Sequence, residues 1–220
     1  MGHRIALIHA TPVAMAPVQA AFQALWPEAE PVNLLDDALS VDRAKEARLT
    51  PAMTERILAL AAYARGLGAD GILFTCSAFG PAIEAAVLES PMPVLKPNQA
   101  MFEAAVGQGR DIAMVATFEP SLAGMTAEFE DEARRAGIDA RLTSTVAPAA
   151  MAALRQGDAE THNRLVADAA QSLMPADAVL LAHFSTSRAA EAVRARVDVP
   201  VLTSPDAAVL KLKGLLVPPT

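Results

Sequence analysis

The sequence contains a single cysteine, Cys76, which directly follows a short apolar run, and His183, one of only four histidines, ends a second such run. A thiol has an ordinary pKa of about 8.5 and an imidazole has an ordinary pKa of about 6.5, so both groups exchange protons close to neutral pH. Such a pair suits removal of a proton from one face of a carbon atom and its delivery to the other face. Thiolate plus imidazolium carries as many protons as thiol plus imidazole, so one protonation state would serve both directions.

An internal repeat relates these two residues, because the same offset of 107 positions that separates Cys76 from His183 recurs along the chain. The matching segments are Ile5-Ala6 with Ile112-Ala113, Ala69-Asp70 with Ala176-Asp177, and Pro93-Val94-Leu95 with Pro200-Val201-Leu202. Taken separately, a lone cysteine is often a small apolar filler and a lone histidine a hydrogen-bonded, half-buried residue. Their equivalent positions in the repeat favour a shared chemical role.

The environment of Cys76 suggests a further property. A helix is predicted to open at Gly80 and Pro81, just after the cysteine. The positive end of a helix dipole lowers the pKa of a nearby thiol, so we expect a lowered pKa and an increased thiolate fraction for Cys76.

The elements that would position these residues are short apolar strands alternating with helices, which is typical of an α/β fold with doubly wound parallel sheets. The predicted strands cover residues 5–9, 71–75, 93–95, 111–116, 178–183 and 200–203. The predicted helices cover residues 51–65, 82–88, 122–136, 159–173 and 188–196. Thr50 before Pro51 is a typical helix start. With the repeat, this pattern predicts two similar halves, residues 1–97 with a C-terminal helix at 206–220, and residues 98–205.

Composition narrows the class of protein. The 220 residues are 53% hydrophobic with a formal charge of −7, which excludes disorder and argues against nucleic-acid or anionic-membrane partners. No apolar run approaches the ~18 residues of a membrane span. One cysteine excludes an intramolecular disulfide and any multi-thiolate metal site, and the histidines lack paired ligand spacing, so no metal is expected. We expect a cytoplasmic protein.

The segments LFTCSAFGPA at residues 73–82 and VATFEPS at residues 115–121, with the Ile-Ala-rich first strand, resemble the aspartate/glutamate racemase superfamily. That superfamily also includes hydantoin racemases, maleate isomerases and arylmalonate decarboxylases. The resemblance implies two flavodoxin-like halves related by a pseudo-twofold axis, an active site in the cleft between them and no cofactor. In the racemases a cysteine from each half flanks the substrate α-carbon. Cys76 matches the first cysteine, and His183 stands where the second would be.

Small polar residues at strand-to-helix turns provide donors for a substrate carboxylate. The candidate binding residues of this kind are Ser77, Thr117, Ser185, Thr186 and Thr11. For Thr11 and Ser121 an ordinary helix cap is the favoured interpretation. Lys96 ends an apolar strand, where it would either bind a second carboxylate or support the thiolate, or else be a surface lysine. We expect His162, on a predicted helix, to face solvent.

Three hypotheses follow. The first is a cofactor-independent racemase or epimerase of an amino acid or related small carboxylate, with Cys76 and His183 as its two bases. The second keeps the Cys76 site for decarboxylation or for maleate-type cis–trans isomerisation. The third is a non-catalytic small-molecule binding protein, which the missing second cysteine supports. Alanine-rich helices would suit a homodimer face, and equally the packing of helices on a sheet.

Overall fold

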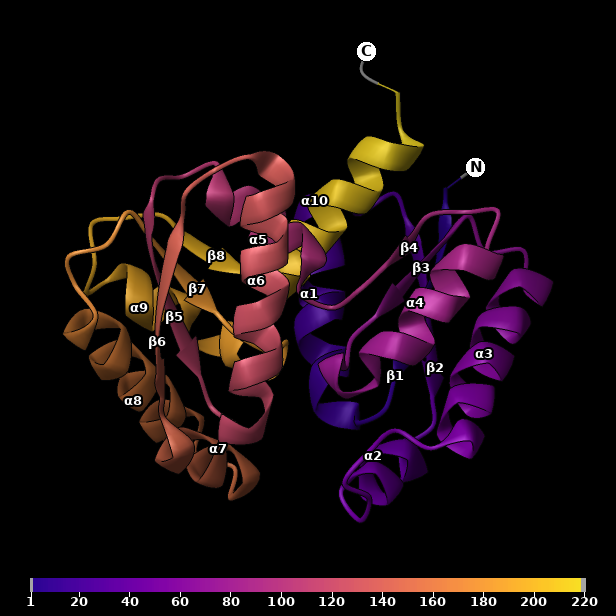
Figure 1. Ribbon diagram of the computed structural model, residues 1–220, viewed down its shortest axis with the longest axis horizontal. Coiled ribbons are helices and arrows are strands. Elements are labelled where there is room, and N and C mark those ends of the chain that lie inside the picture. Colours follow the sequence, from indigo (N-terminus) through magenta and orange to yellow (C-terminus); the bar gives the residue numbers. More distant parts are fainter. Residues whose placement is uncertain (1, 219–220) are drawn as a thin grey trace. The chain divides into compact units, whose positions relative to one another are not determined.

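The computed structural model describes residues 2–218 and divides them into two compact units. Unit 1 comprises residues 2–97 and 208–218, and unit 2 comprises residues 98–207. Each unit has one four-stranded parallel sheet covered by helices (Figure 1). The predicted α/β class and the two similar halves are confirmed.

Unit 1 has the strand order β2-β1-β3-β4. Its strands are β1 (Arg4–His9), β2 (Glu30–Leu35), β3 (Gly71–Phe74) and β4 (Val94–Leu95). Its helices are α1 (Met15–Leu25), α2 (Ala38–Arg43), α3 (Pro51–Gly66), α4 (Gly80–Glu89) and the greater part of α10 (Ser204–Leu216). Two 3₁₀ turns, η1 (Pro12–Ala14) and η2 (Ser77–Phe79), follow β1 and β3. The predicted start of α3 is confirmed, because the Thr50 hydroxyl accepts a hydrogen bond from Met53 N at 3.3 Å.

Unit 2 repeats this plan with the order β6-β5-β7-β8. Its strands are β5 (Asp111–Ala116), β6 (Arg141–Val146), β7 (Ala178–Leu181) and β8 (Val201–Thr203). Its helices are α5 (Gln99–Val106), α6 (Leu122–Ala136), α7 (Pro148–Arg155), α8 (Ala159–Ser172) and α9 (Ala190–Arg194), with 3₁₀ turns η3 (Glu119–Ser121) and η4 (Ser185–Ala189). β1 and β5, β3 and β7, and η1 and η3 each begin 107 positions apart, as the repeat predicts.

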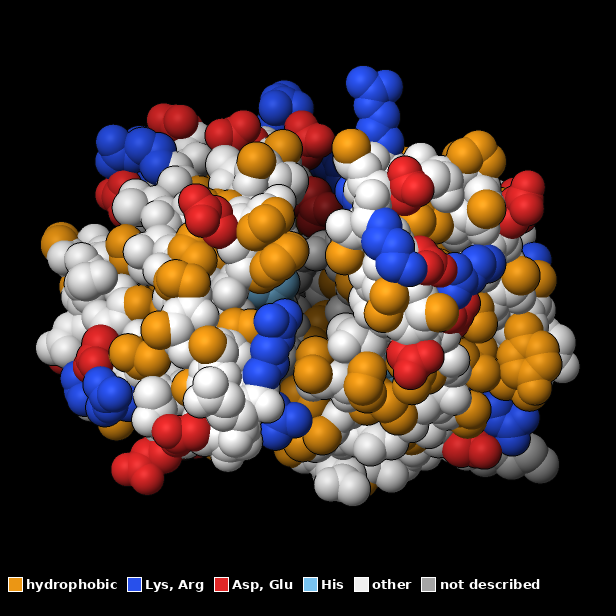
Figure 2. Space-filling view, turned by 90° about the horizontal axis from the view of Figure 1, so that it is seen from below, with side chains coloured by type: hydrophobic (Ala, Val, Ile, Leu, Met, Phe, Trp, Pro, Cys, Tyr) orange, Lys and Arg blue, Asp and Glu red, His pale blue; other side chains and the backbone are white. Residues whose placement is uncertain are grey.

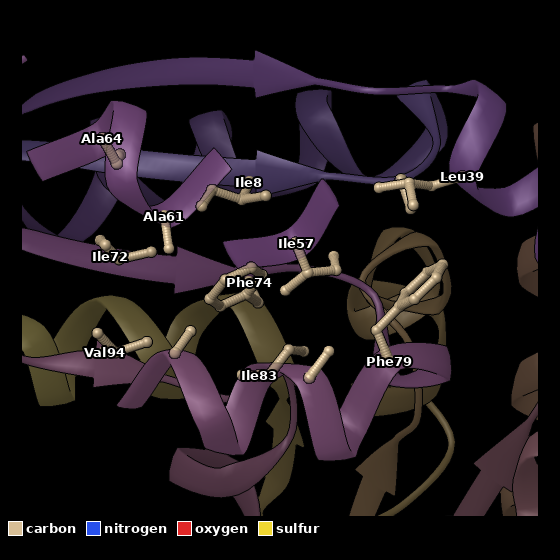
Figure 3. Close-up of a cluster of buried hydrophobic side chains, with 14 of the residues drawn as sticks. Ile8, Leu39, Ile57, Ala61, Ala64, Ile72, Phe74, Phe79, Ile83 and Val94 are labelled. Carbon is tan, nitrogen blue, oxygen red and sulfur yellow. The ribbon is translucent and has the colours of Figure 1, made fainter. Parts of the chain in front are cut away.

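Apolar strands form the centre of each sheet because helices cover both of its faces. In unit 1, Ile57 and Ala61 of α3 and Ile83 of α4 pack toward Ile8 and Phe74 of the sheet (Figure 3). In unit 2, α5 and α6 bury one face, and α7, α8 and α9 bury the other. Cys76 and His183 each lie two residues beyond a buried central strand, β3 or β7, and that strand fixes the start of the turn that carries them.

The repeated Ala-Asp pairs have a structural cause. Asp70 and Asp177 each precede a central strand and bond to the chain at the start of the neighbouring strand. Asp70 donates its N–H to Arg4 O at 2.7 Å, and its carboxylate accepts from Arg4 N at 2.8 Å. Asp177 donates its N–H to Asp111 O at 2.7 Å, and its carboxylate accepts from Asp111 N at 2.9 Å. In both halves the aspartate therefore adds hydrogen bonds at the amino end of the sheet, where the central strands begin.

The repeated prolines also have a structural cause. Pro93 O accepts from Ile72 N, and Pro200 O accepts from Val179 N, both at 2.9 Å. Proline has no N–H to contribute to a ladder, so it is tolerated at the entrance of an edge strand, where its carbonyl alone is used. This explains why a Pro-Val-Leu tripeptide opens the last strand of each sheet.

Several local predictions were wrong. β2, β6, α1, α2, α5 and α7 were not predicted. The strand predicted to end at His183 ends at Leu181, so the histidine lies in the following loop. His162 does not face solvent: its side chain is fully buried, and its Nδ1 lies 2.9 Å from Asn163 Oδ1. The residues next to His162 in the sequence, Thr161 and Asn163, are polar, which is why the sequence indicated an exposed position.

Two surface properties bear on partners. None of the helices within residues 2–218 is both long and apolar enough to cross a membrane. On the face drawn in Figure 2, Lys and Arg side chains are interspersed with Asp and Glu side chains.

Candidate active site

The strand order places a topological switch point in each unit, between β1 and β3 in unit 1 and between β5 and β7 in unit 2. Open α/β sheets bind ligands beyond the carboxyl ends of the strands at such points. The predicted residues Thr11, Cys76 and Ser77 follow β1 and β3. The predicted residues Thr117, His183, Ser185 and Thr186 follow β5 and β7. Each unit therefore brings its predicted residues, Lys96 excepted, to its own switch point.

Cys76 lies two residues beyond β3, half-buried against the core of unit 1. Burial raises the pKa of its thiol, because the thiolate would lose solvation, while the Ala78 backbone N–H and the Arg43 guanidinium oppose this shift. The expected lowering of the pKa was therefore wrong. α4 begins only at Gly80, after the turn η2, and burial outweighs the effects that favour the thiolate.

Arg43, the last residue of α2, is the cation that acts on Cys76, and sequence reasoning missed it. Its Nε donates to Ala78 O at 3.3 Å and its Nη1 donates to Glu46 O at 2.6 Å. Among the described residues of unit 1, no carboxylate forms an ion pair with it, whereas Arg56 bonds to both Asp36 and Asp42. A guanidinium bonded only to carbonyls beside a thiol is suited to hold a carboxylate.

A buried polar chain crosses three strands next to Cys76. His9, the fully buried last residue of β1, places Nδ1 2.8 Å from the Thr75 hydroxyl and Nε2 3.0 Å from Asn33 Oδ1 of β2. Burial lowers the pKa of His9, against a smaller opposing effect of Asn33, so the ring is neutral at neutral pH. The chain ties the carboxyl end of β3, and hence the backbone before Cys76, to β1 and β2.

His183 has an unusual backbone and one engaged ring nitrogen. Its φ is 71°, in the left-handed region that few residues other than glycine adopt. Its Nε2 lies 2.8 Å from the Ser121 hydroxyl, which also donates to Phe118 O at 2.8 Å, while Nδ1 is buried without a hydrogen-bond partner. Burial lowers the pKa of His183 to about 4, partly opposed by the Ala182 carbonyl, so this imidazole is also neutral at neutral pH.

The predicted hydroxyl residues differ in their surroundings. Thr117 and Thr186 are buried, and their hydroxyl oxygens lie 3.3 Å apart. Ser185, which precedes Thr186 in the sequence, is also buried. Ser77 is half-buried at the start of η2. Thr11 is also half-buried and precedes η1 without bonding to it, so its interpretation as a cap was wrong. Ser121 makes no cap bond to α6 either, and its hydroxyl serves His183 instead.

Lys96 directly follows β4, the strand that pairs with β3. Its Nζ forms an ion pair with Glu84 Oε1 of α4 at 3.1 Å, and only 17% of the side chain is exposed. It is therefore neither a free surface lysine nor an unpaired cation. Binding of a substrate carboxylate would require it to exchange Glu84.

The described part of the chain shows no group of three His, Cys, Asp or Glu side chains arranged to hold a metal ion. The groups gathered at the two switch points are acids, bases, hydroxyls and one guanidinium. They are suited to proton transfer on a small anionic molecule.

Comparison with known proteins identifies the family. The model of the Asp/Glu/hydantoin racemase family matches residues 8–174, which is most of the chain. The protein therefore belongs to the Asp/Glu/hydantoin racemase family, which confirms the resemblance found in the sequence. No curated protein sequence gives a significant match to this chain.

Solved structures of similar fold agree at low sequence identity. Aspartate racemase from Picrophilus torridus superposes with a TM-score of 0.75 at 14% identity, over 96% of this chain and 93% of that one. Allantoin racemase from Klebsiella pneumoniae gives 0.66 at 17% identity, over 97% and 87%. A glycine-to-cysteine variant of arylmalonate decarboxylase gives 0.70 at 18% identity, over 96% and 93%. These likenesses establish the fold.

Proposed function

We propose that this protein is a cofactor-independent racemase or epimerase that moves a proton at the α-carbon of an amino acid or related small carboxylate. Cys76 and His183 are the two residues that exchange the proton. The observation that carries this proposal is their equivalence: each follows the central strand after the switch point in one of two similar halves, 107 positions apart. Membership of a racemase family supports the reaction type.

The protonation states of the two residues are complementary. With the pKa of Cys76 raised and that of His183 lowered to about 4, the thiol and the neutral imidazole coexist at neutral pH. The imidazole accepts the proton from one face of the α-carbon, and the thiol donates its proton to the other face. The resulting thiolate and imidazolium hold the same number of protons and carry out the reverse inversion.

Binding of the substrate carboxylate falls to the polar groups beside these two residues. The hydroxyls of Ser77, Thr117, Ser185, Thr186 and Thr11 are the donors proposed from the sequence. Arg43 adds a positive charge close to Cys76. A guanidinium offers two parallel N–H donors to a carboxylate, and its charge also stabilises the carbanion-like transition state next to that carboxylate.

Decarboxylation is the second candidate, and the raised pKa of Cys76 favours it. In that reaction the bond between the α-carbon and a carboxylate breaks and its electron pair stays on the α-carbon, while an oxygen lone pair forms the second C=O bond of the departing CO₂. The resulting carbanion takes the thiol proton. One proton donor is then sufficient, and His183 would not be required. The structural likeness to arylmalonate decarboxylase is compatible with this chemistry.

The test is proton exchange in D₂O followed by NMR, with a panel of amino acids, hydantoins and small dicarboxylates. Wild type, Cys76→Ser and His183→Asn are compared, and asparagine is chosen because it tolerates a positive φ. His3→Gln, which lies outside the proposed site, is the control. We expect exchange at the α-carbon with inversion in wild type and the control, and a loss of at least about 100-fold in both site variants.

Other outcomes contradict the proposal in distinct ways. Release of CO₂ that needs Cys76 but not His183 would establish the decarboxylase. Unchanged exchange in Cys76→Ser would remove the cysteine from the mechanism. Binding of a panel member, seen as a thermal shift, without turnover of any member would favour a binding protein.

A further inference from the structure

The conformation of His183 is the starting point. Among the described residues other than glycine, it alone has a positive φ. Holding a histidine in the left-handed region costs on the order of 1 kcal/mol, so such strain marks a position where the direction of the side chain matters. The turn is closed by Thr186 N, which donates to His183 O at 3.3 Å. The ring thereby reaches Ser121 of η3, a residue far away in sequence.

The hydrogen bonds around Ser121 define which ring nitrogen carries the hydrogen. The Ser121 hydroxyl has a single hydrogen, which it donates to the Phe118 carbonyl at 2.8 Å. The Ser121 oxygen then has lone pairs alone to offer to Nε2 at 2.8 Å. With the hydroxyl hydrogen on Phe118 O, a neutral ring bonds to Ser121 by donating its one N–H from Nε2. Nδ1 then keeps a lone pair and makes no hydrogen bond with the described residues. The Ala182 carbonyl, which raises the pKa of the ring, is an acceptor that competes with Ser121 for the ring hydrogen.

We propose that Ser121 is a positioning residue that holds His183 as the Nε2–H tautomer and so leaves Nδ1 as the atom that accepts the substrate proton. This inference rests on the proposed function, because it assigns an orientation to one of its two bases. Ser121 acts through His183 and not on the substrate. When Nδ1 takes up the proton, the imidazolium N–H at Nε2 forms a charge-assisted hydrogen bond to Ser121, which the Phe118 carbonyl reinforces.

The repeat supplies an independent argument. The residue 107 positions before Ser121 is Ala14, the last residue of η1, which is buried and has no hydroxyl. Ala14 therefore belongs to the half that carries Cys76, and Ser121 belongs to the half that carries His183. A thiol has no tautomers to select, whereas an imidazole has two. The hydroxyl is present only in the half whose base needs it.

The first test reads the tautomer directly and does not depend on turnover. Protein labelled with ¹⁵N at histidine is examined by NMR at neutral pH, and the His183 signals are identified by their loss in His183→Asn. We expect hydrogen at Nε2 and none at Nδ1 in wild type. Ser121→Ala should populate both tautomers, and Ser121→Thr should restore the wild-type spectrum. Hydrogen at Nδ1 of the wild-type ring, or an unchanged tautomer in Ser121→Ala, would overturn the assignment.

The second test is kinetic and uses a matched control. Ser187 of η4 also donates its hydroxyl to a backbone carbonyl, Phe184 O, at 2.7 Å, but it does not contact His183. We expect Ser121→Ala to lower kcat about tenfold or more with little change in KM and a displaced pH profile, Ser121→Thr to recover most of kcat, and Ser187→Ala to behave as wild type. Equal kcat in Ser121→Ala and wild type would refute the positioning role.

The two tests separate the two levels of the argument. If wild type turns over no substrate, the proposed function fails, while the tautomer measurement still decides whether Ser121 orients His183. If wild type is active and the tautomer is the opposite one, the function stands and the positioning role fails.

Discussion

At the scale of single residues, one physical effect accounts for the protonation of both proposed bases. Burial disfavours the charged form of any titrating group. For Cys76 the charged form is the thiolate, so the pKa rises, and for His183 it is the imidazolium, so the pKa falls. The same desolvation therefore prepares a proton donor in one half and a proton acceptor in the other.

Sequence reasoning proposed the two residues but did not predict the direction in which their pKa values are shifted. Residue type and position in the repeat are properties of the sequence, and they were sufficient to select Cys76 and His183. Burial and the approach of Arg43 from α2 depend on how distant segments pack. The helix-dipole argument for Cys76 was wrong for that reason, since it considered only the neighbouring segment.

Arg43 is predicted to control the reactivity of the Cys76 thiol. Arg43→Gln removes the positive charge that favours the thiolate, so we expect the pKa of Cys76 to rise further. The rate of alkylation by iodoacetamide near neutral pH should fall about two- to fivefold, since the thiolate is the reacting form. Because Cys76 is the one cysteine, the alkylation rate reports on it alone.

Arg48→Gln is the control for this measurement, since it removes a positive charge from the connection that follows α2. It should alkylate at the wild-type rate. A wild-type rate in Arg43→Gln would show that the guanidinium does not influence the thiol in solution.

At the scale of elements, the central strands and the short edge strands β4 and β8 were predictable, whereas the edge strands β2 and β6 were not. β1, β3, β5 and β7 are apolar and almost wholly buried, which gives them continuous hydrophobic runs. β2 and β6 are half-exposed and mix polar with apolar residues, so they show neither a continuous run nor a regular alternation. The chain of His9, Thr75 and Asn33 was missed for the same reason, because Asn33 lies on β2.

The second prediction concerns this polar chain, which joins three strands of unit 1. Thr75→Val keeps the shape of the side chain but removes the hydroxyl that bonds to the buried Nδ1 of His9. Nδ1 of His9 is then buried without a hydrogen-bond partner, which should reduce the free energy of unfolding by about 1–3 kcal/mol. Thr75→Ser, which keeps the hydroxyl, should lose less. Urea denaturation at neutral pH measures both.

A matched control lies in unit 2. Thr143 is exposed on β6, so Thr143→Val should change the free energy of unfolding by no more than about 0.5 kcal/mol. If Thr75→Val is as stable as Thr143→Val, the buried chain does not hold the strands together.

At the scale of the whole molecule, the repeat was the most informative property of the sequence. It aligned β1, β3 and β4 with β5, β7 and β8, the turn η1 with η3, and the two proposed bases, all at one offset. Its differences are as useful as its identities, because Cys76 and Ala14 in one half correspond to His183 and Ser121 in the other. The identical positions are explained by the sheets, through Asp70, Asp177 and the two prolines, and the differing ones lie where chemistry is proposed.

The last prediction is the dependence of stability on pH. The pKa of His183 is lowered from 6.5 to about 4, and that of His9 is also lowered. Between these values the unfolded chain binds protons that the folded chain does not, so the free energy of unfolding falls as pH decreases from about 6.5. For His183 alone the loss is on the order of 3 kcal/mol and is complete near pH 4. The contribution is fully present above pH 6.5.

Urea denaturation at intervals between pH 7.5 and about 4 tests this, with His183→Asn as the comparison. The variant should lose less stability over that range, because asparagine does not titrate and tolerates the positive φ of this position. Below this range a separate loss should begin, since the pKa values of Asp42, Asp158 and Asp177 are lowered from 3.8 by their hydrogen bonds. Parallel pH profiles of wild type and variant would show that His183 titrates alike in the folded and unfolded chains. The burial that keeps it a neutral base would then be absent in solution, and with it the physical basis for its role as proton acceptor.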